Sequence, residues 1–157
     1  MDKTKIDYRT KTASEENIYL HLNECSANFI PDLNETVDIK EYSKKIFSKA
    51  ITFEAWKENR LIGLVAAYMN DIETFSAYIT SVSVTRDYFG SGVALQILSM
   101  AIQYAEKNHF STICLEVNKQ NKVAVQLYEK YNFKIVEEKG NLYLMKHDIQ
   151  GINEKPD

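Results

Sequence analysis

The segment from residue 75 to residue 117 constrains the fold most, because it joins two strands through one long helix. A β-branched strand over residues 75–85 leads into a small-residue loop at 90–92. Apolar pairs then recur at helical spacing over residues 93–109, and a second strand follows at 113–117. Because a strand–helix–strand connection is right-handed and returns in the same direction, the two strands are predicted to lie parallel.

Hairpins flank this unit on both sides. Strands at 51–56 and 61–69 surround the polar turn 57–60, and strands at 133–136 and 142–145 surround Gly140-Asn141. The other predicted elements are a strand at 6–9, a helix from Ser14 to about residue 28, a break at 31–34, and helices at 38–50 and 122–131. The order β-α-α-β-β-β-α-β-α-β-β predicts an α+β (α/β mixed) fold. Its sheet should be mostly antiparallel, with one parallel pair and about four helices on its faces. We expect a single domain over residues 1–150 and a polar tail at 151–157.

Composition excludes several functions. The 157 residues are 45% hydrophobic and 26% charged, which is typical of one globular domain. A net charge of -3 gives no electrostatic basis for nucleic-acid binding. No apolar run approaches the roughly 18 residues of a membrane span, and the N-terminus lacks a signal-peptide core, so we expect a cytoplasmic protein. The three histidines and two cysteines lack metal-ligand spacing, and no metal is expected.

The loop before the long helix is a candidate anion site. Free N–H groups at a helix start attract anions, and glycines let a phosphate approach the backbone. A plain turn with a glycine N-cap is an equal alternative from this loop alone. A P-loop is excluded because no Gly-Lys-Ser/Thr follows, and a dinucleotide fingerprint is excluded because Leu95 occupies its third glycine position.

A second motif follows the strand at 113–117. Asn121, Ala124, Leu127, Tyr128, Lys130 and Phe133 match Asn-x-x-Ala-x-x-Leu-Tyr-x-Lys-x-Gly-Phe. Gly92 and Ala94 match the small positions of Arg/Gln-x-x-Gly-x-Gly/Ala upstream. Together these motifs resemble the GNAT superfamily of N-acetyltransferases, and the resemblance extends in element order over nearly the whole chain.

The sequence departs from the family pattern at two positions. Phe89 stands where the family has Arg or Gln, which removes one phosphate-facing side chain; Arg86 lies three residues upstream and is a candidate replacement. Asn132 replaces the usual glycine, and asparagine tolerates the left-handed conformation that a helix end requires.

The resemblance implies that acetyl-CoA lies between two splayed parallel strands. The backbones of Val82 and Val84 would contact the pantetheine arm, and Asn121 would bond the strand or the cofactor. Tyr128 would be the general acid that protonates the leaving thiolate; its alternative role is packing under the sheet. The pyrophosphate would rest on the N–H groups of Phe89, Gly90, Ser91, Gly92, Val93 and Ala94.

The acceptor side is less specified. Glu54, Glu73 and Glu116 are candidate general bases, with proton loss to water as the alternative. Phe29 and Tyr42 are candidate acceptor-binding residues, because the family shapes its acceptor site from the first two helices. We expect a small primary amine of amino sugar, amino acid or polyamine type. The alternatives are a protein N-terminal or lysine acetyltransferase, and a non-catalytic acyl-CoA-binding module. A homodimer is an open alternative to a monomer.

Overall fold

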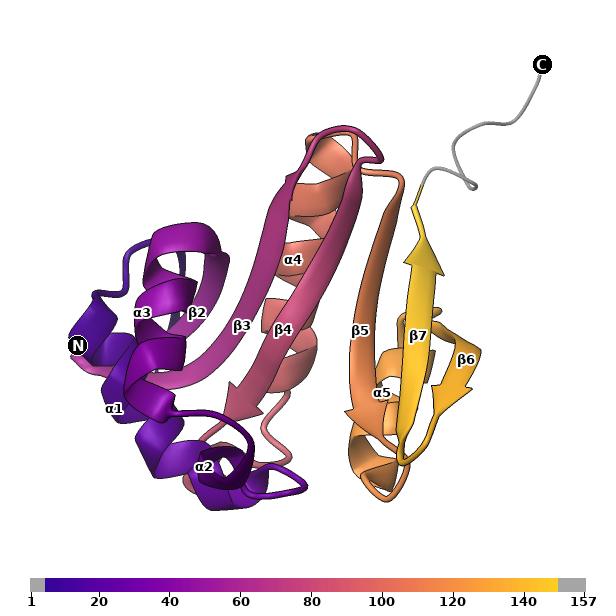
Figure 1. Ribbon diagram of the computed structural model, residues 1–157. Coiled ribbons are helices and arrows are strands. Elements are labelled where there is room, and N and C mark those ends of the chain that lie inside the picture. The colour runs from indigo at the N-terminus through magenta and orange to yellow at the C-terminus, as the bar shows by residue number, and fades with distance from the viewer. Residues whose placement is uncertain (1–4, 150–157) are drawn as a thin grey trace.

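The computed structural model describes residues 5–149, which form one seven-stranded sheet in the order β1-β2-β3-β4-β5-β7-β6 (Figure 1). Neighbouring strands are antiparallel except β4 and β5, which are parallel as the sequence predicts. The mixed α+β fold is therefore confirmed. The strands are β1 (Asp7–Thr10), β2 (Ile51–Lys57), β3 (Arg60–Asp71), β4 (Ser76–Val84), β5 (Thr112–Asn118), β6 (Lys134–Lys139) and β7 (Leu142–Asp148).

The described residues form five α-helices, one more than the four expected. The additional helix is α2, a single turn that begins in the predicted break at 31–34 and runs beyond it. Asp32 caps it by accepting from the Asn34 N–H. The helices are α1 (Glu15–Cys25), α2 (Leu33–Thr36), α3 (Ile39–Lys49), α4 (Val93–Lys107) and α5 (Lys122–Lys130), with 3₁₀ turns η1 (Ser26–Asn28) and η2 (Arg86–Tyr88).

Helices cover both faces of the sheet. In Figure 1, α4 and α5 lie behind the strands, and α1, α2 and α3 lie in front of the half that contains β2 and β3. Strand β3 is buried on both faces because Val65 and Ala67 belong to the core that includes α4, while Leu64 and Ala66 belong to the core that includes α1 and α3. This double burial explains why its sequence is a nearly continuous apolar run.

Gly63 allows α4 to begin close against β3. A Cβ atom at Gly63 would lie 2.8 Å from Val93 Cγ1 and 3.2 Å from Ile97 Cδ1. Any side chain there would push the first turn of α4 away from the sheet. Gly63 therefore helps to fix where the N-terminus of α4 lies relative to the strands.

Among residues 5–149, no helix combines the length and apolar character needed to cross a membrane. The tail predicted at 151–157 lies outside the described residues.

Candidate functional site

The parallel strands β4 and β5 separate halfway along their length. They pair over four residues, from Ser76 with Thr112 to Ile79 with Leu115. Beyond this point β4 continues beside β3 to Val84, and β5 continues beside β7 to Asn118. A cavity of about 780 Å³ is lined by both diverging strands.

A β-bulge marks the point of separation. The β3 partners change from Ala66 for Ser81 to Ala67 for Ile79, which leaves Thr80 without a register partner among the described residues of β3. A bulge bends its strand and increases its twist. The bulge therefore lies where β4 turns away from β5.

The main-chain groups of Val82 and Val84 point into this separation. The Thr85 N–H donates to the Ile62 carbonyl of β3 over 2.9 Å. Because antiparallel bonding alternates along a strand, Ser83 also bonds toward β3 while Val82 and Val84 direct their N–H and C=O groups the other way. Both valines line the cavity, so the site offers unpaired strand backbone to a ligand.

The glycine loop closes one end of the cavity. Phe89, Gly90, Gly92 and Ala94 line it. The two glycines have φ values of 76° and 89°, the left-handed region that glycine adopts at little cost. The N-cap residue Gly92 has no side chain, and the Ser91 hydroxyl accepts from the Val93 N–H over 3.3 Å. The first turn of α4 carries no acidic residue, in contrast to α1 and α3. The helix N-terminus therefore keeps its attraction for an anion.

Two members of the predicted loop do not line the cavity. The Ser91 hydroxyl donates to the Tyr88 carbonyl over 2.6 Å, and Val93 is buried in the core beneath α4. Their side chains shape the loop from within.

The aromatic residue at the Arg/Gln position lies at the mouth of the cavity. Phe89 is 55% exposed. The Arg86 guanidinium lies 6.0 Å from its ring centroid and donates to Asn28 Oδ1 over 3.1 Å. Arg86 thus bridges the glycine loop to η1 and is not among the lining residues.

Helix α5 brings Tyr128 and Asn121 to the opposite wall. Tyr128 is buried, packs at a tilt against Phe133 with ring centroids 5.9 Å apart, and lines the cavity. Burial raises the pKa of its phenol well above 10, so the hydroxyl remains protonated across the physiological range. Asn121 also lines the cavity, and its Oδ1 caps α5 by accepting from the Ala124 N–H over 3.2 Å.

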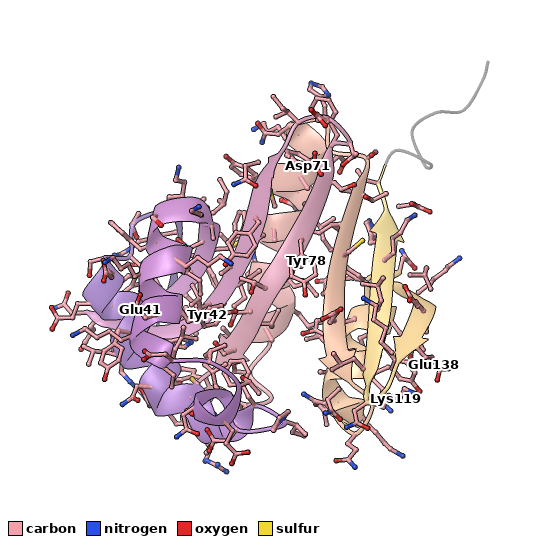
Figure 2. All side chains as sticks on the ribbon, in the orientation of Figure 1. Glu41, Tyr42, Asp71, Tyr78, Lys119 and Glu138 are labelled. Carbon is pink, nitrogen blue, oxygen red and sulfur yellow. The ribbon has the colours of Figure 1, made fainter. Side chains whose placement is uncertain are left out.

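The three candidate bases lie in different places. Glu116 lines the cavity, with Lys139 Nζ 3.4 Å from its carboxylate. Burial, and then the nearby Glu116 charge, raise the pKa of Tyr78 to about 12; Figure 2 labels Tyr78 on β4. Glu73 follows Asp71 in the β3–β4 hairpin, at the far end of β4 from the cavity (Figure 2).

Glu54 has a structural environment instead. It has no exposed surface and does not line the cavity. Its carboxylate accepts hydrogen bonds from two main-chain N–H groups, two hydroxyls and one indole. The donors are Thr12 N, Ala13 N, Thr12 Oγ1, Thr52 Oγ1 and Trp56 Nε1. A carboxylate bonded in this way holds the start of α1 against β2 and is not available to a ligand.

The two candidate acceptor residues also differ. Phe29 lines the cavity beside Asn28 and Ile30. Tyr42 is not among the lining residues, and its hydroxyl donates to the carbonyl of Thr80, which is.

Sequence reasoning missed His21, whose Nε2 lies 2.9 Å from the Ser83 hydroxyl. A contact across 62 positions leaves no local signal. Among the residues that the structure describes, no group of three His, Cys, Asp or Glu side chains could hold a metal.

Comparison with known proteins agrees with this geometry. The family model described as "Acetyltransferase (GNAT) family" matches residues 16–133. N-alpha-acetyltransferase MAK3 of Arabidopsis thaliana is 26% identical over 134 residues, covering 84% of this chain and 68% of that protein. Streptothricin acetyltransferase A of Bacillus subtilis is 34% identical over 81 residues, which cover 52% of this chain and 46% of that protein. The structure of PaiA N-acetyltransferase from Thermoplasma acidophilum in complex with coenzyme A matches 92% of this chain and 99% of that one, with a TM-score of 0.72 and 16% identity. The family match covers most of the sequence and includes the separated strands β4 and β5 and the glycine loop before α4. The chain therefore belongs to the acetyltransferase (GNAT) family of acetyl-CoA-dependent enzymes.

Proposed function

We propose that this protein transfers the acetyl group of acetyl-CoA to the primary amine of a small molecule by direct attack. One observation carries the proposal. The unpaired backbone of β4, the start of α4 and the buried phenol of Tyr128 line a single cavity. A thioester held along β4 would therefore lie within the same enclosure as a proton donor.

Binding follows from the main chain. Val82 and Val84 offer strand-like N–H and C=O groups to the amides of the pantetheine arm. The N–H groups of Phe89, Ser91 and Val93 already donate within the loop, to the Arg86 and Tyr88 carbonyls and the Ser91 hydroxyl. Those of Gly90, Gly92 and Ala94 offer donors to the pyrophosphate, and the helix dipole adds to their attraction. The open space around Gly90 and Gly92 suits this contact, because a Cβ atom built at either position meets no atom within 4 Å.

The residues of the chain then divide the chemistry. Acetyl-CoA supplies a thioester whose carbonyl gains negative charge as the amine attacks. The Val82 N–H stabilises that charge. Tyr128 gives its proton to the departing sulfur, and its raised pKa keeps that proton available at neutral pH. The ammonium form of the acceptor loses one proton to Glu116 or to water before it attacks. The nitrogen loses a second proton as the tetrahedral intermediate collapses, which restores the one that Tyr128 gave to sulfur. Glu54 and Glu73 lie outside the cavity.

The charged residues that line the cavity limit the kind of amine that it can accept. Among the described residues of the cavity, Glu116 and Lys130 are the only charged ones. A carboxylate of Glu116 beside the acceptor favours an amine on a cationic or neutral molecule, such as an amino sugar or a polyamine. It disfavours an amino acid, whose own carboxylate it would repel.

A protein N-terminus is the second candidate acceptor. The relative from Arabidopsis thaliana bears the name of an N-alpha-acetyltransferase, and the one from Bacillus subtilis is named for streptothricin. A screen of amino sugars, polyamines, amino acids and short peptides, following free thiol released from acetyl-CoA, decides between them. Release with peptides alone would replace the small-molecule assignment.

Replacing the acid tests the mechanism. Tyr128→Phe should lower kcat by roughly 10- to 1000-fold, the range for one positioned proton donor. The wild-type rate should fall at strongly alkaline pH, where the Tyr128 phenol ionises, and this fall should be absent from the variant. The Kd for acetyl-CoA should change little. Tyr131→Phe is the matched control. Tyr131 lies three residues after Tyr128, and the substitution deletes a hydroxyl that donates to the Leu95 carbonyl. Wild-type kcat in Tyr128→Phe would leave Tyr128 a packing residue and favour a non-catalytic acyl-CoA-binding module.

A further inference from the structure

Two side chains from the helices in front of the sheet hold β4 at points three residues apart. Tyr42 of α3 donates its hydroxyl to the Thr80 carbonyl over 2.7 Å and lies 2.6 Å from Thr80 Oγ1. His21 of α1 places Nε2 2.9 Å from Ser83 Oγ. Figure 2 shows Tyr42 on the side of α3 that faces β4. The two contacts enclose the segment between them.

The contact from Tyr42 is made at the bulge of β4. Thr80 is the bulge residue, and the pairing of β4 with β5 ends one residue before it. Its main chain therefore lacks a register partner among the described strands. Thr80 is half-buried, and the Tyr42 hydroxyl donates to its carbonyl.

The contact from His21 fixes the direction of the Ser83 hydroxyl. His21 Nδ1 lies 2.9 Å from the Leu61 carbonyl, which can only accept, so Nδ1 carries the hydrogen. Nε2 is then the acceptor, and the Ser83 hydroxyl donates to it. His21 is 2% exposed, and burial lowers its pKa to about 4, which keeps the ring neutral. Ser83 is thus held by its side chain as well as by β3.

We propose that Tyr42 and His21 are positioning residues that hold the 80–83 segment of β4 so that the Val82 N–H meets the thioester carbonyl of acetyl-CoA. The inference rests on the proposed function, because it assigns a purpose to the unpaired Val82 backbone. A bulged strand that has lost one neighbour is poorly restrained by the sheet alone. Small errors in the placement of a donor cost large factors in rate, since the donor must meet the charge that develops in the transition state.

Removal of each hydroxyl tests the proposal at both contacts. In Tyr42→Phe and in Ser83→Ala, we expect kcat to fall by about 10-fold or more. We also expect the affinity for acetyl-CoA to fall relative to that for CoA, which has no thioester carbonyl. Thr12→Val is the matched control: it deletes a hydroxyl that bonds the buried Glu54, remote from the cavity. It should lower the melting temperature and leave both readouts unchanged.

The ratio of the two affinities separates positioning from general stabilisation. If Tyr42→Phe lowers the melting temperature yet leaves kcat and the acetyl-CoA to CoA affinity ratio at wild-type values, the proposal is overturned. The ratio needs no acceptor, so it reports on the positioning even if no amine is acetylated. Absence of transfer to every amine would count against the proposed function alone. The double variant should be little worse than the worse single one, because either loss frees the same segment, and independent multiplication of the two effects would contradict a shared segment.

Discussion

Glu54 carries a carboxylate into the interior between β2 and the start of α1. Its two oxygens accept five hydrogen bonds, one of them from the Trp56 indole, which cannot reverse its role as a hydroxyl can. We therefore expect Glu54→Gln to lower the free energy of unfolding by about 1–3 kcal/mol, because the amide group would oppose a donor. Denaturant unfolding measures the loss. If Glu54→Gln keeps the wild-type kcat at a low temperature where it is folded, Glu54 has a structural role. A large loss of kcat in the folded variant would restore Glu54 as a candidate base.

His21 makes stability depend on pH. Burial lowers its pKa from 6.5 to about 4, against the opposing effects of the bond to the Leu61 carbonyl, the Glu24 charge and the bond to Ser83; Arg60 adds to the lowering. Because the unfolded chain binds more protons than the folded one between these values, stability from this group is complete above about pH 6.5. It is lost as the pH falls toward 4, by roughly 3 kcal/mol in total. His21→Gln should flatten the slope of unfolding free energy against pH over this window. An unchanged slope would show that the pKa of His21 does not differ between the folded and the unfolded protein.

The glycine loop permits a matched comparison at the scale of an element. Gly92 begins α4 with a φ of 89°, and Gly140 turns β6 into β7 with a φ of 58°; a Cβ atom at either meets no atom within 4 Å. Alanine should therefore destabilise both positions by a similar amount, about 1 kcal/mol, through backbone strain. Only Gly92→Ala should weaken acetyl-CoA binding in calorimetry, since its methyl group would stand where the pyrophosphate approaches. Equal affinities in the two variants would reduce the loop to a turn.

Elements with a strong local pattern could be predicted from the sequence. Helix α5 was expected at 122–131 and is observed at Lys122–Lys130, and Asn132 adopts the expected left-handed conformation with φ 67°. Helix α2 could not be predicted, because one turn capped by Asp32 has no periodicity.

The order β5-β7-β6 of the last strands could not be predicted from the sequence either. Ile135 and Val136 look like core residues, yet they are 41% and 53% exposed on the edge strand β6, while Met145 of β7 is fully buried. Which strand of a hairpin pairs with β5 depends on long-range packing that a local pattern does not contain.

The candidate site divides in the same way. The glycines, Tyr128 and Asn121 belong to contiguous motifs and line the cavity. Glu54 and Glu116 both lie on strands among apolar neighbours, so the sequence offers no means to tell a buried structural carboxylate from one beside a cavity. The contacts of His21 and Tyr42 with β4 span 62 and 38 positions and depend on the complete fold.

At the scale of the whole molecule, the cavity joins two parts of the sheet that pair directly over four residues. A ligand that contacts both β4 and β5 binds the folded protein and not the unfolded chain. Acetyl-CoA at 100 times its Kd should therefore raise the free energy of unfolding by about 2.7 kcal/mol, and the melting temperature with it. Thermal unfolding with and without ligand measures the shift, and Gly92→Ala should reduce it. A flat response at millimolar acetyl-CoA would contradict the assignment of the cavity.

The separation of β4 from β5 also gives the sheet two interior edges besides the outer ones at β1 and β6. Exposed edges invite pairing with a strand of another molecule, which is a common route to aggregation. The outer edges are defended against this: β1 has four residues, and β6 carries Lys134, Glu137, Glu138 and Lys139. The interior edges belong to the longer strands β4 and β5, but they face one another across a confined space. A slender ligand with amide groups can enter there, whereas the edge of a second folded sheet cannot. The unpaired backbone that suits a small ligand is thereby kept away from neighbouring chains.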